Sequence, residues 1–115
     1  MSPLRALQAR FVVLQGQFIA WCDANGYKLS FGESWRSPAE AQLNAQTGAG
    51  IANSLHPLRL AQDWNINKDD VELTSVEDYR PLGDYWKSLD PLCCWGGNFA
   101  KPDADHFSMT WGGVK

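Results

Sequence analysis

The first quarter of the chain carries a single apolar stripe with helical spacing. Large apolar side chains recur at alternating steps of three and four residues, namely Leu4, Leu7, Phe11, Leu14, Phe18 and Trp21. This spacing places them on one face of an α-helix. Asn25 and Gly26 follow, and glycine readily adopts the left-handed conformation that ends a helix. Because 115 residues suffice for one hydrophobic core, we expect residues 1–115 to form a single domain in which this helix covers the core.

The rest of the chain mixes strand and helix patterns. Residues 27–35 alternate as in a strand, and the apolar residues of 58–64 predict a second, buried strand. Ser37 and Pro38 are typical of a helix start, and we expect that short helix to continue to Gln46. Pro81 is predicted to open a further helix, and residues 106–109 to form another strand.

Residues 65–72 are polar and acidic, and we interpret them as a loop. Asn65, Asn67 and Asp69 alternate as the ligands of some calcium loops do. The glycine and the terminal bidentate glutamate of such loops are absent at the required offsets. We therefore do not expect a calcium site in this segment.

Charge and hydropathy exclude several classes of protein. Ten Lys and Arg are scattered among 13 Asp and Glu, for a net charge of -3, which disfavours nucleic-acid binding. No apolar run approaches the roughly 20 residues that cross a bilayer, and no Sec-type signal is recognisable. Three cysteines, including the neighbours Cys93 and Cys94, do not suggest a disulfide framework. We expect buried thiols in a reducing compartment, with no nucleic-acid or membrane partner.

Each of the two histidines lies close to an aspartate in the sequence. His56 precedes Asp63 by seven residues, and Asp103 precedes His106 by three. Two imidazoles and one carboxylate are a known ligand set for catalytic zinc, which leaves a position for water. Hydrolysis also needs a group that takes the proton of that water, and Asp103 is the candidate. The alternative is that the histidines are partly buried hydrogen-bonding residues and the aspartates cap turns.

Two motifs resemble those of a peptidase family. The run 54–63 reads Ser-Leu-His-Pro-Leu-Arg-Leu-Ala-Gln-Asp, and it is followed by Trp-Gly-Gly at 95–97 and by Asp-x-x-His at 103–106. The first and last of these segments resemble the two motifs of the zinc peptidases of the D-alanyl-D-alanine carboxypeptidase and L-alanyl-D-glutamate endopeptidase family. The first motif of that family is Ser-x-His-x-x-Gly-x-Ala-x-Asp, and the second is Asp or Glu, two residues and then His. Residues 34–42 resemble the upstream segment of that family, so that the similarity extends over most of the chain from Tyr27 onward.

The resemblance implies an α+β fold of the hedgehog and DD-peptidase type, a small antiparallel sheet with helices packed on one side. It implies that His56, Asp63 and His106 bind Zn²⁺ and that Asp103 is the general base. Arg36 would bind substrate or stabilise the oxyanion, although an ordinary surface ion pair is an equal alternative.

Ser54 is placed to orient the first ligand through a hydrogen bond, or else it is simply a turn residue. Arg59 stands where the family usually has glycine, so either the backbone needs no unusual angle there or the turn differs. Asp105 could compete with Asp103 as the base, but in an extended segment it would face away from the metal if His106 faces it. Trp95 could form a wall beside the substrate or belong to the core, and we favour the core.

The predicted function is that of a zinc metallopeptidase acting on peptidoglycan stem peptides. The chain resembles bacteriophage endolysins of the family, which implies a monomer made in the host cytoplasm that reaches the wall after the membrane is breached. Cleavage between L-alanine and D-glutamate is the expected reaction. The alternatives are a D-alanyl-D-alanine carboxypeptidase or dipeptidase, and a non-catalytic, metal-stabilised wall-binding or virion module.

Overall fold

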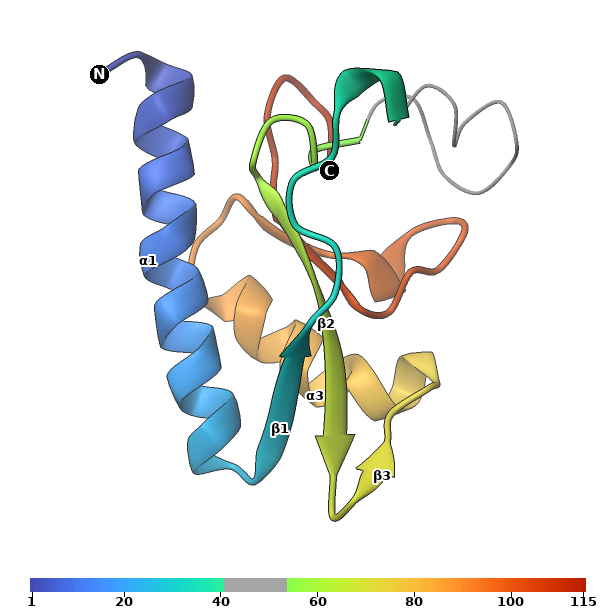
Figure 1. Ribbon diagram of the computed structural model, residues 1–115. Coiled ribbons are helices and arrows are strands. Elements are labelled where there is room, and N and C mark those ends of the chain that lie inside the picture. Colours follow the sequence, from blue (N-terminus) through green and yellow to red (C-terminus); the bar gives the residue numbers. More distant parts are fainter. Residues whose placement is uncertain (41–53) are drawn as a thin grey trace.

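The computed structural model describes residues 1–40 and 54–115, and Figure 1 shows how its elements are arranged. The long elements are helix α1 (Pro3–Ala24), helix α3 (Val76–Ser88) and strand β2 (Ala61–Lys68). The shorter elements are β1 (Tyr27–Phe31), β3 (Val71–Glu72), β4 (Cys93–Trp95), the 3-10 helix η1 (Gly96–Asn98) and β5 (His106–Met109). The strands pair antiparallel in the order β1-β2-β5-β4, and β3 pairs with β2. The predicted antiparallel sheet is therefore confirmed.

Helix α1 confirms the predicted N-terminal helix. Ser2 caps it, because the Ser2 hydroxyl accepts a hydrogen bond from the amide of Arg5. The apolar stripe is buried at Phe11, Leu14 and Phe18, whereas the opposite face is exposed. Among the helices that the structure describes, α1 included, none is both long and apolar enough to span a membrane.

Both long helices pack on the same face of the sheet. Trp64 and Phe107 project from this face of β2 and β5. The Trp64 indole donates to the Gln15 side chain of α1 (2.8 Å), and the Tyr79 hydroxyl of α3 donates to the Trp64 carbonyl (3.1 Å). The ring of Phe107 lies 4.7 Å from that of Phe18, measured between centroids. The predicted α+β fold with helices on one side is confirmed. The candidate site described below lies on the opposite face of the sheet.

The interpretation of residues 65–72 as a loop is wrong. Strand β2 continues to Lys68 and turns back into β3. Asp69 and Asp70 both have positive φ (53° and 63°), as in the tight turns that join antiparallel strands. The segment looks polar because Ile66 is its one buried side chain and the others face solvent. The strand also begins at Ala61, later than predicted, because the preceding residues form a turn.

The predicted helix starts had mixed outcomes. Helix α3 begins at Val76, five residues before the expected start at Pro81, because Ser75 and Asp78 form a capping box there. Ser37 does cap a helical turn, since its hydroxyl accepts from the amide of Glu40 (3.0 Å). Residues 41–46 of that predicted helix lie outside the described residues. The first predicted strand ends at Phe31, four residues early.

Trp95 belongs to the core, as we favoured. It is buried, its indole donates to the carbonyl of Ala104 (2.6 Å), and its ring packs against Gly83 of α3. The neighbouring Cys93 is also buried, whereas Cys94 is half-buried and contacts Thr110. Trp95 thus holds α3 against the strand that leads into the site.

The contact between Gly83 and Trp95 predicts opposite effects for two glycine substitutions in helices. Gly83→Ala should lower the free energy of unfolding by about 1 to 3 kcal/mol, because the new methyl group would overlap the indole ring. Gly16→Ala is the matched control in α1, where nothing lies near the added carbon, and it should raise that free energy by about 0.5 to 1 kcal/mol. Urea unfolding measures both. Equal effects would contradict this account of the packing.

Candidate metal centre

The register of β2 and β5 brings Asp63 and His106 together. These residues are directly opposite each other in the antiparallel pair, so their side chains leave the same face of the sheet. That face is the one opposite Trp64 and Phe107, away from the long helices. The amide of Asp63 donates to the carbonyl of Glu33 (2.8 Å), which ties the segment after β1 to the site.

His56 lies in a tight turn just before β2. The amide of Leu60 donates to the carbonyl of Leu55, and the amide of Arg59 to the carbonyl of His56, both at 3.1 Å. This pair of bonds is that of a Schellman turn, whose left-handed position is usually glycine. Arg59 occupies it with φ of 57°, so the idea that the backbone needs no unusual angle here is wrong.

Two serines orient His56. The Ser54 hydroxyl accepts from the backbone amide of His56 (3.1 Å), so Ser54 acts on the turn and does not touch the ring. The ring is oriented by the carbonyl of Ser34, which accepts a hydrogen bond from Nδ1 (2.5 Å) and leaves Nε2 free to bind a metal. Sequence reasoning missed Ser34, because a backbone carbonyl carries no residue-type signal.

The three predicted ligand residues converge. Asp63 Oδ1 lies 3.3 Å from His56 Nε2 and 3.4 Å from His106 Nδ1, and the ligand atoms all lie within 4.8 Å of one another. The two histidines are only 3% and 6% exposed. Asp63 Oδ1 is buried, yet it has no hydrogen-bond partner among the described residues. A buried oxygen that faces two imidazole nitrogens without a hydrogen bond suits a cation, so this group could hold a metal ion.

The electrostatics of the cluster reflect this convergence. Burial by itself lowers the pKa of His56, but the Asp63 carboxylate and the Ser34 carbonyl outweigh it, so that the pKa is raised above 6.5. Burial by itself raises the pKa of Asp63, but the two imidazoles outweigh it, so that the pKa is lowered below 3.8. The cluster therefore keeps the carboxylate charged, as a metal ligand must be.

Asp103 lies at the edge of this cluster. Its Oδ2 atom is 3.9 Å from His106 Nδ1, and its side chain is 54% exposed. Its backbone is held firmly, since its amide donates to the carbonyl of Gly96 (2.9 Å) and its carbonyl accepts from the amide of His106 (3.2 Å). Gly96 permits this approach, because a side chain there would overlap the Asp103 carbonyl. Asp103 can therefore contact both the cluster and a molecule in solution.

Asp105 does not face away from the cluster, and that prediction is wrong. Residues 104 and 105 form a turn, so the alternation of an extended strand does not apply to them. The carboxylate oxygens of Asp63, Asp103 and Asp105 lie within 4.8 Å of one another. Burial, a hydrogen bond with Asp103 and the nearby negative charges raise the pKa of Asp105 to about 7.

Arg36 makes the ion pair that we considered for it. Its guanidinium binds both carboxylate oxygens of Glu33, with Nε 2.7 Å from Oε1, and its side chain is 11% exposed. The hydrogen bonds from Arg36 lower the pKa of Glu33 below its ordinary value. Arg36 also lines the cleft that is described next, so this ion pair does not remove its side chain from the candidate site.

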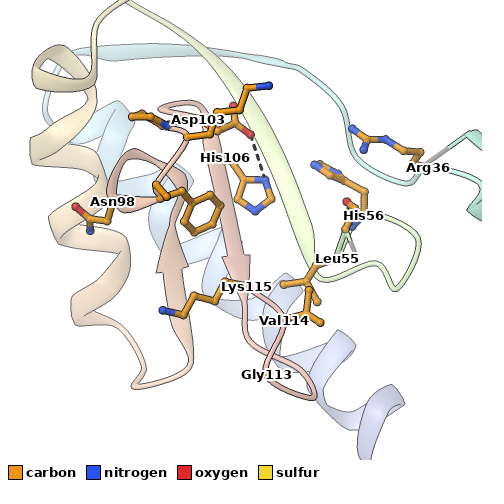
Figure 2. A pocket seen from close by; sticks show the side chains of 14 residues that line it. Arg36, Leu55, His56, Asn98, Asp103, His106, Gly113, Val114 and Lys115 are labelled. Carbon is orange, nitrogen blue, oxygen red and sulfur yellow. Dashed lines mark hydrogen bonds and ion pairs between the residues drawn. The ribbon is translucent and has the colours of Figure 1, made fainter. Parts of the chain in front are cut away.

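A cleft of about 690 Å³ opens beside this cluster, and His56, His106 and Asp103 line it. One wall is formed by residues 98–103, and another by residues 113–115. Figure 2 shows His56, Arg36, Asp103 and His106 at one end of this cleft, with Val114 and Lys115 beyond them. The candidate site is therefore open to an extended molecule.

Comparison with known proteins supports the fold. The chain is similar to the crystal structure of the L-Ala D-Glu endopeptidase ChiX of Serratia marcescens, with a TM-score of 0.66 and 20% sequence identity. The similarity covers 93% of this chain and 83% of ChiX. No protein-family model matches the chain, and no curated protein matches it by sequence. The shared fold agrees with the hedgehog and DD-peptidase type that the sequence resemblance implies.

The environment of Asp105 predicts a distinct pH dependence of stability. The pKa of Asp105 in the native protein lies above the value of 3.8 in the unfolded chain. In the metal-free protein its contribution to the free energy of unfolding is therefore fully present below pH 3.8, and it is lost as the pH rises from 3.8 through about 7. Asp105→Asn removes this loss and should raise the free energy of unfolding at pH 8 by on the order of 1 kcal/mol or more, with little change at pH 4. Urea unfolding with a chelator at both values measures it. The same difference from the unmodified protein at both pH values would contradict this account.

Proposed function

We propose that this protein is a zinc metallopeptidase that hydrolyses peptidoglycan stem peptides, preferentially between L-alanine and D-glutamate. The observation that carries the proposal is the convergence of His56, Asp63 and His106 beside an open cleft. The fold shared with an L-Ala D-Glu endopeptidase and the two sequence motifs support it.

The ligand set fits zinc. His56 Nε2, His106 Nδ1 and Asp63 Oδ1 would hold the ion, and two nitrogen donors with one carboxylate oxygen are typical of catalytic zinc. Bound there, zinc would supply Lewis-acid activation of water and of the peptide carbonyl. The Ser34 carbonyl keeps the proton of His56 on Nδ1, so that Nε2 presents its lone pair to the ion.

Two further side chains carry the chemistry in this proposal. Asp103 accepts a proton from the attacking water and delivers it to the leaving amine, because its exposed carboxylate lies at the edge of the ligand cluster. Arg36 stabilises the negative charge that develops on the carbonyl oxygen, since Glu33 holds its guanidinium in place beside the cleft.

The proposal extends to the biological role. We assign residues 1–115 to a single catalytic domain that acts as a monomer in the manner of a bacteriophage endolysin. Such an enzyme is made in the host cytoplasm and reaches the wall after the membrane is breached. This assignment rests on the resemblance of the sequence to the endolysins of the family.

The proposed roles predict that zinc binding and hydrolysis can be separated by substitution. Asp103→Ala should retain stoichiometric zinc but lose at least about 100-fold in the hydrolysis of defined muropeptides, because the proton acceptor is gone. His106→Ala should lose zinc as well. Metal analysis and mass spectrometry of the released fragments measure the two properties.

Asp84→Ala is the matched control, because Asp84 is an exposed aspartate of α3 that pairs with Lys87 on the surface. It should change neither zinc content nor rate. Undiminished hydrolysis by Asp103→Ala would refute the assignment of the base. Release of D-alanine would favour the carboxypeptidase, and zinc binding without any hydrolysis would favour the non-catalytic module.

A further inference from the structure

Arg59 adopts a left-handed backbone conformation that is unfavourable for a residue with a side chain. It is the left-handed residue of the His56 turn, with φ of 57°, where the family motif has glycine. This conformation is strained for a residue with a side chain, whereas it is not strained for glycine. This strain lies in the turn that carries a proposed metal ligand.

The Arg59 side chain contacts a segment that is distant in sequence. Its guanidinium carbon lies 5.2 Å from the centre of the Trp35 ring, within the range of a cation–π interaction. Trp35 is 49% exposed, so it is not a core residue held by burial on all sides. The stacking therefore joins the turn before β2 to the segment that follows β1, which lie near each other in Figure 1.

The segment around Trp35 supports the site at three points. The Glu33 carbonyl accepts from the amide of Asp63 (2.8 Å), and the Ser34 carbonyl accepts from Nδ1 of His56 (2.5 Å). The next residue after Trp35 is Arg36, which lines the cleft. A change in the position of residues 33–36 would therefore move the ring of His56 and the guanidinium of Arg36 together.

We propose that Arg59 is a positioning residue, which stacks on Trp35 and thereby holds residues 33–36 so that the Ser34 carbonyl orients His56 for metal binding. This inference rests on the proposed function, because it assumes that His56 binds zinc. The inference predicts a change in zinc affinity that is opposite in sign to the change expected from the loss of the Arg59 charge alone. If the charge of Arg59 acted on the zinc ion directly, its removal would strengthen zinc binding, whereas loss of the stacking should weaken it.

The test compares Arg59→Gly with Arg59→Lys. Glycine removes both the backbone cost and the stacking, whereas lysine keeps the backbone cost and a cation for the ring. We expect the metal-free Arg59→Gly protein to melt at a temperature no lower than Arg59→Lys, yet to bind zinc about three- to tenfold more weakly than the unmodified protein. Arg59→Lys should recover most of the affinity. Competition with a chromophoric chelator measures the zinc dissociation constant, and circular dichroism measures the melting temperature.

Two further variants complete the experiment. Trp35→Leu should weaken zinc binding as Arg59→Gly does, and the double variant should be no weaker than either single one, because both remove the same contact. Asp70→Gly is the matched control, since Asp70 has a similar φ of 63° in the distant turn between β2 and β3. It should raise the melting temperature and leave zinc affinity unchanged.

The outcomes separate this inference from the proposed function. Zinc affinity of Arg59→Gly within twofold of that of a zinc-binding unmodified protein would overturn the positioning role and leave the proposed function intact. An equal loss in Arg59→Lys and Arg59→Gly would also overturn it, because the stacking cation would then be irrelevant. An unmodified protein that binds no zinc would overturn both.

Discussion

The site depends on one register, the pairing of Asp63 of β2 with His106 of β5. In an antiparallel pair, a shift of one residue would move one of these side chains to the face covered by the helices. The register is held by side chains on that other face, where Trp64 and Phe107 pack into the core beneath α1 and α3. The burial of aromatic rings on one face thus decides which polar side chains meet on the opposite face.

The second histidine reaches the same point by a different route. His56 is not in the sheet, and a turn closed by two backbone hydrogen bonds brings it to the start of β2. Its ring is then oriented by a carbonyl from the segment after β1. A cluster assembled from a turn and two strands can be rigid without a disulfide, because each contributor is fixed by backbone hydrogen bonds. Such rigidity is what a metal site with a defined geometry requires.

The ligand cluster and the acidic groups beside it differ in their electrostatics. The two imidazoles beside Asp63 outweigh its burial and lower its pKa, whereas burial, together with two nearby carboxylates, raises the pKa of Asp105 to about 7. Three carboxylates so close together repel one another, and a bound cation would relieve that repulsion. The His56, Asp63 and His106 group could therefore hold a cation.

Much of this could be predicted from the sequence, and the failures have physical causes. The spacing of apolar residues identified α1, and the motifs identified the three residues that converge, because helical periodicity and short motifs are local properties. Residues 65–72 were mistaken for a loop because a strand at the solvent face buries only one side chain in that stretch, Ile66. Asp105 was misplaced because the chain turns at residues 104 and 105, and the alternation rule holds only for extended backbone.

The amino-acid sequence by itself determined the long helix, because helical periodicity is a local property. Its motifs, through their resemblance to a peptidase family, implied the antiparallel α+β fold and the candidate ligands. Only the tertiary structure decided that the Ser34 carbonyl orients His56, that Asp105 joins the carboxylate cluster and that Arg59 reaches Trp35. These contacts join residues through backbone atoms, turns and distant segments. Their formation depends on how the whole chain packs, which no local pattern records.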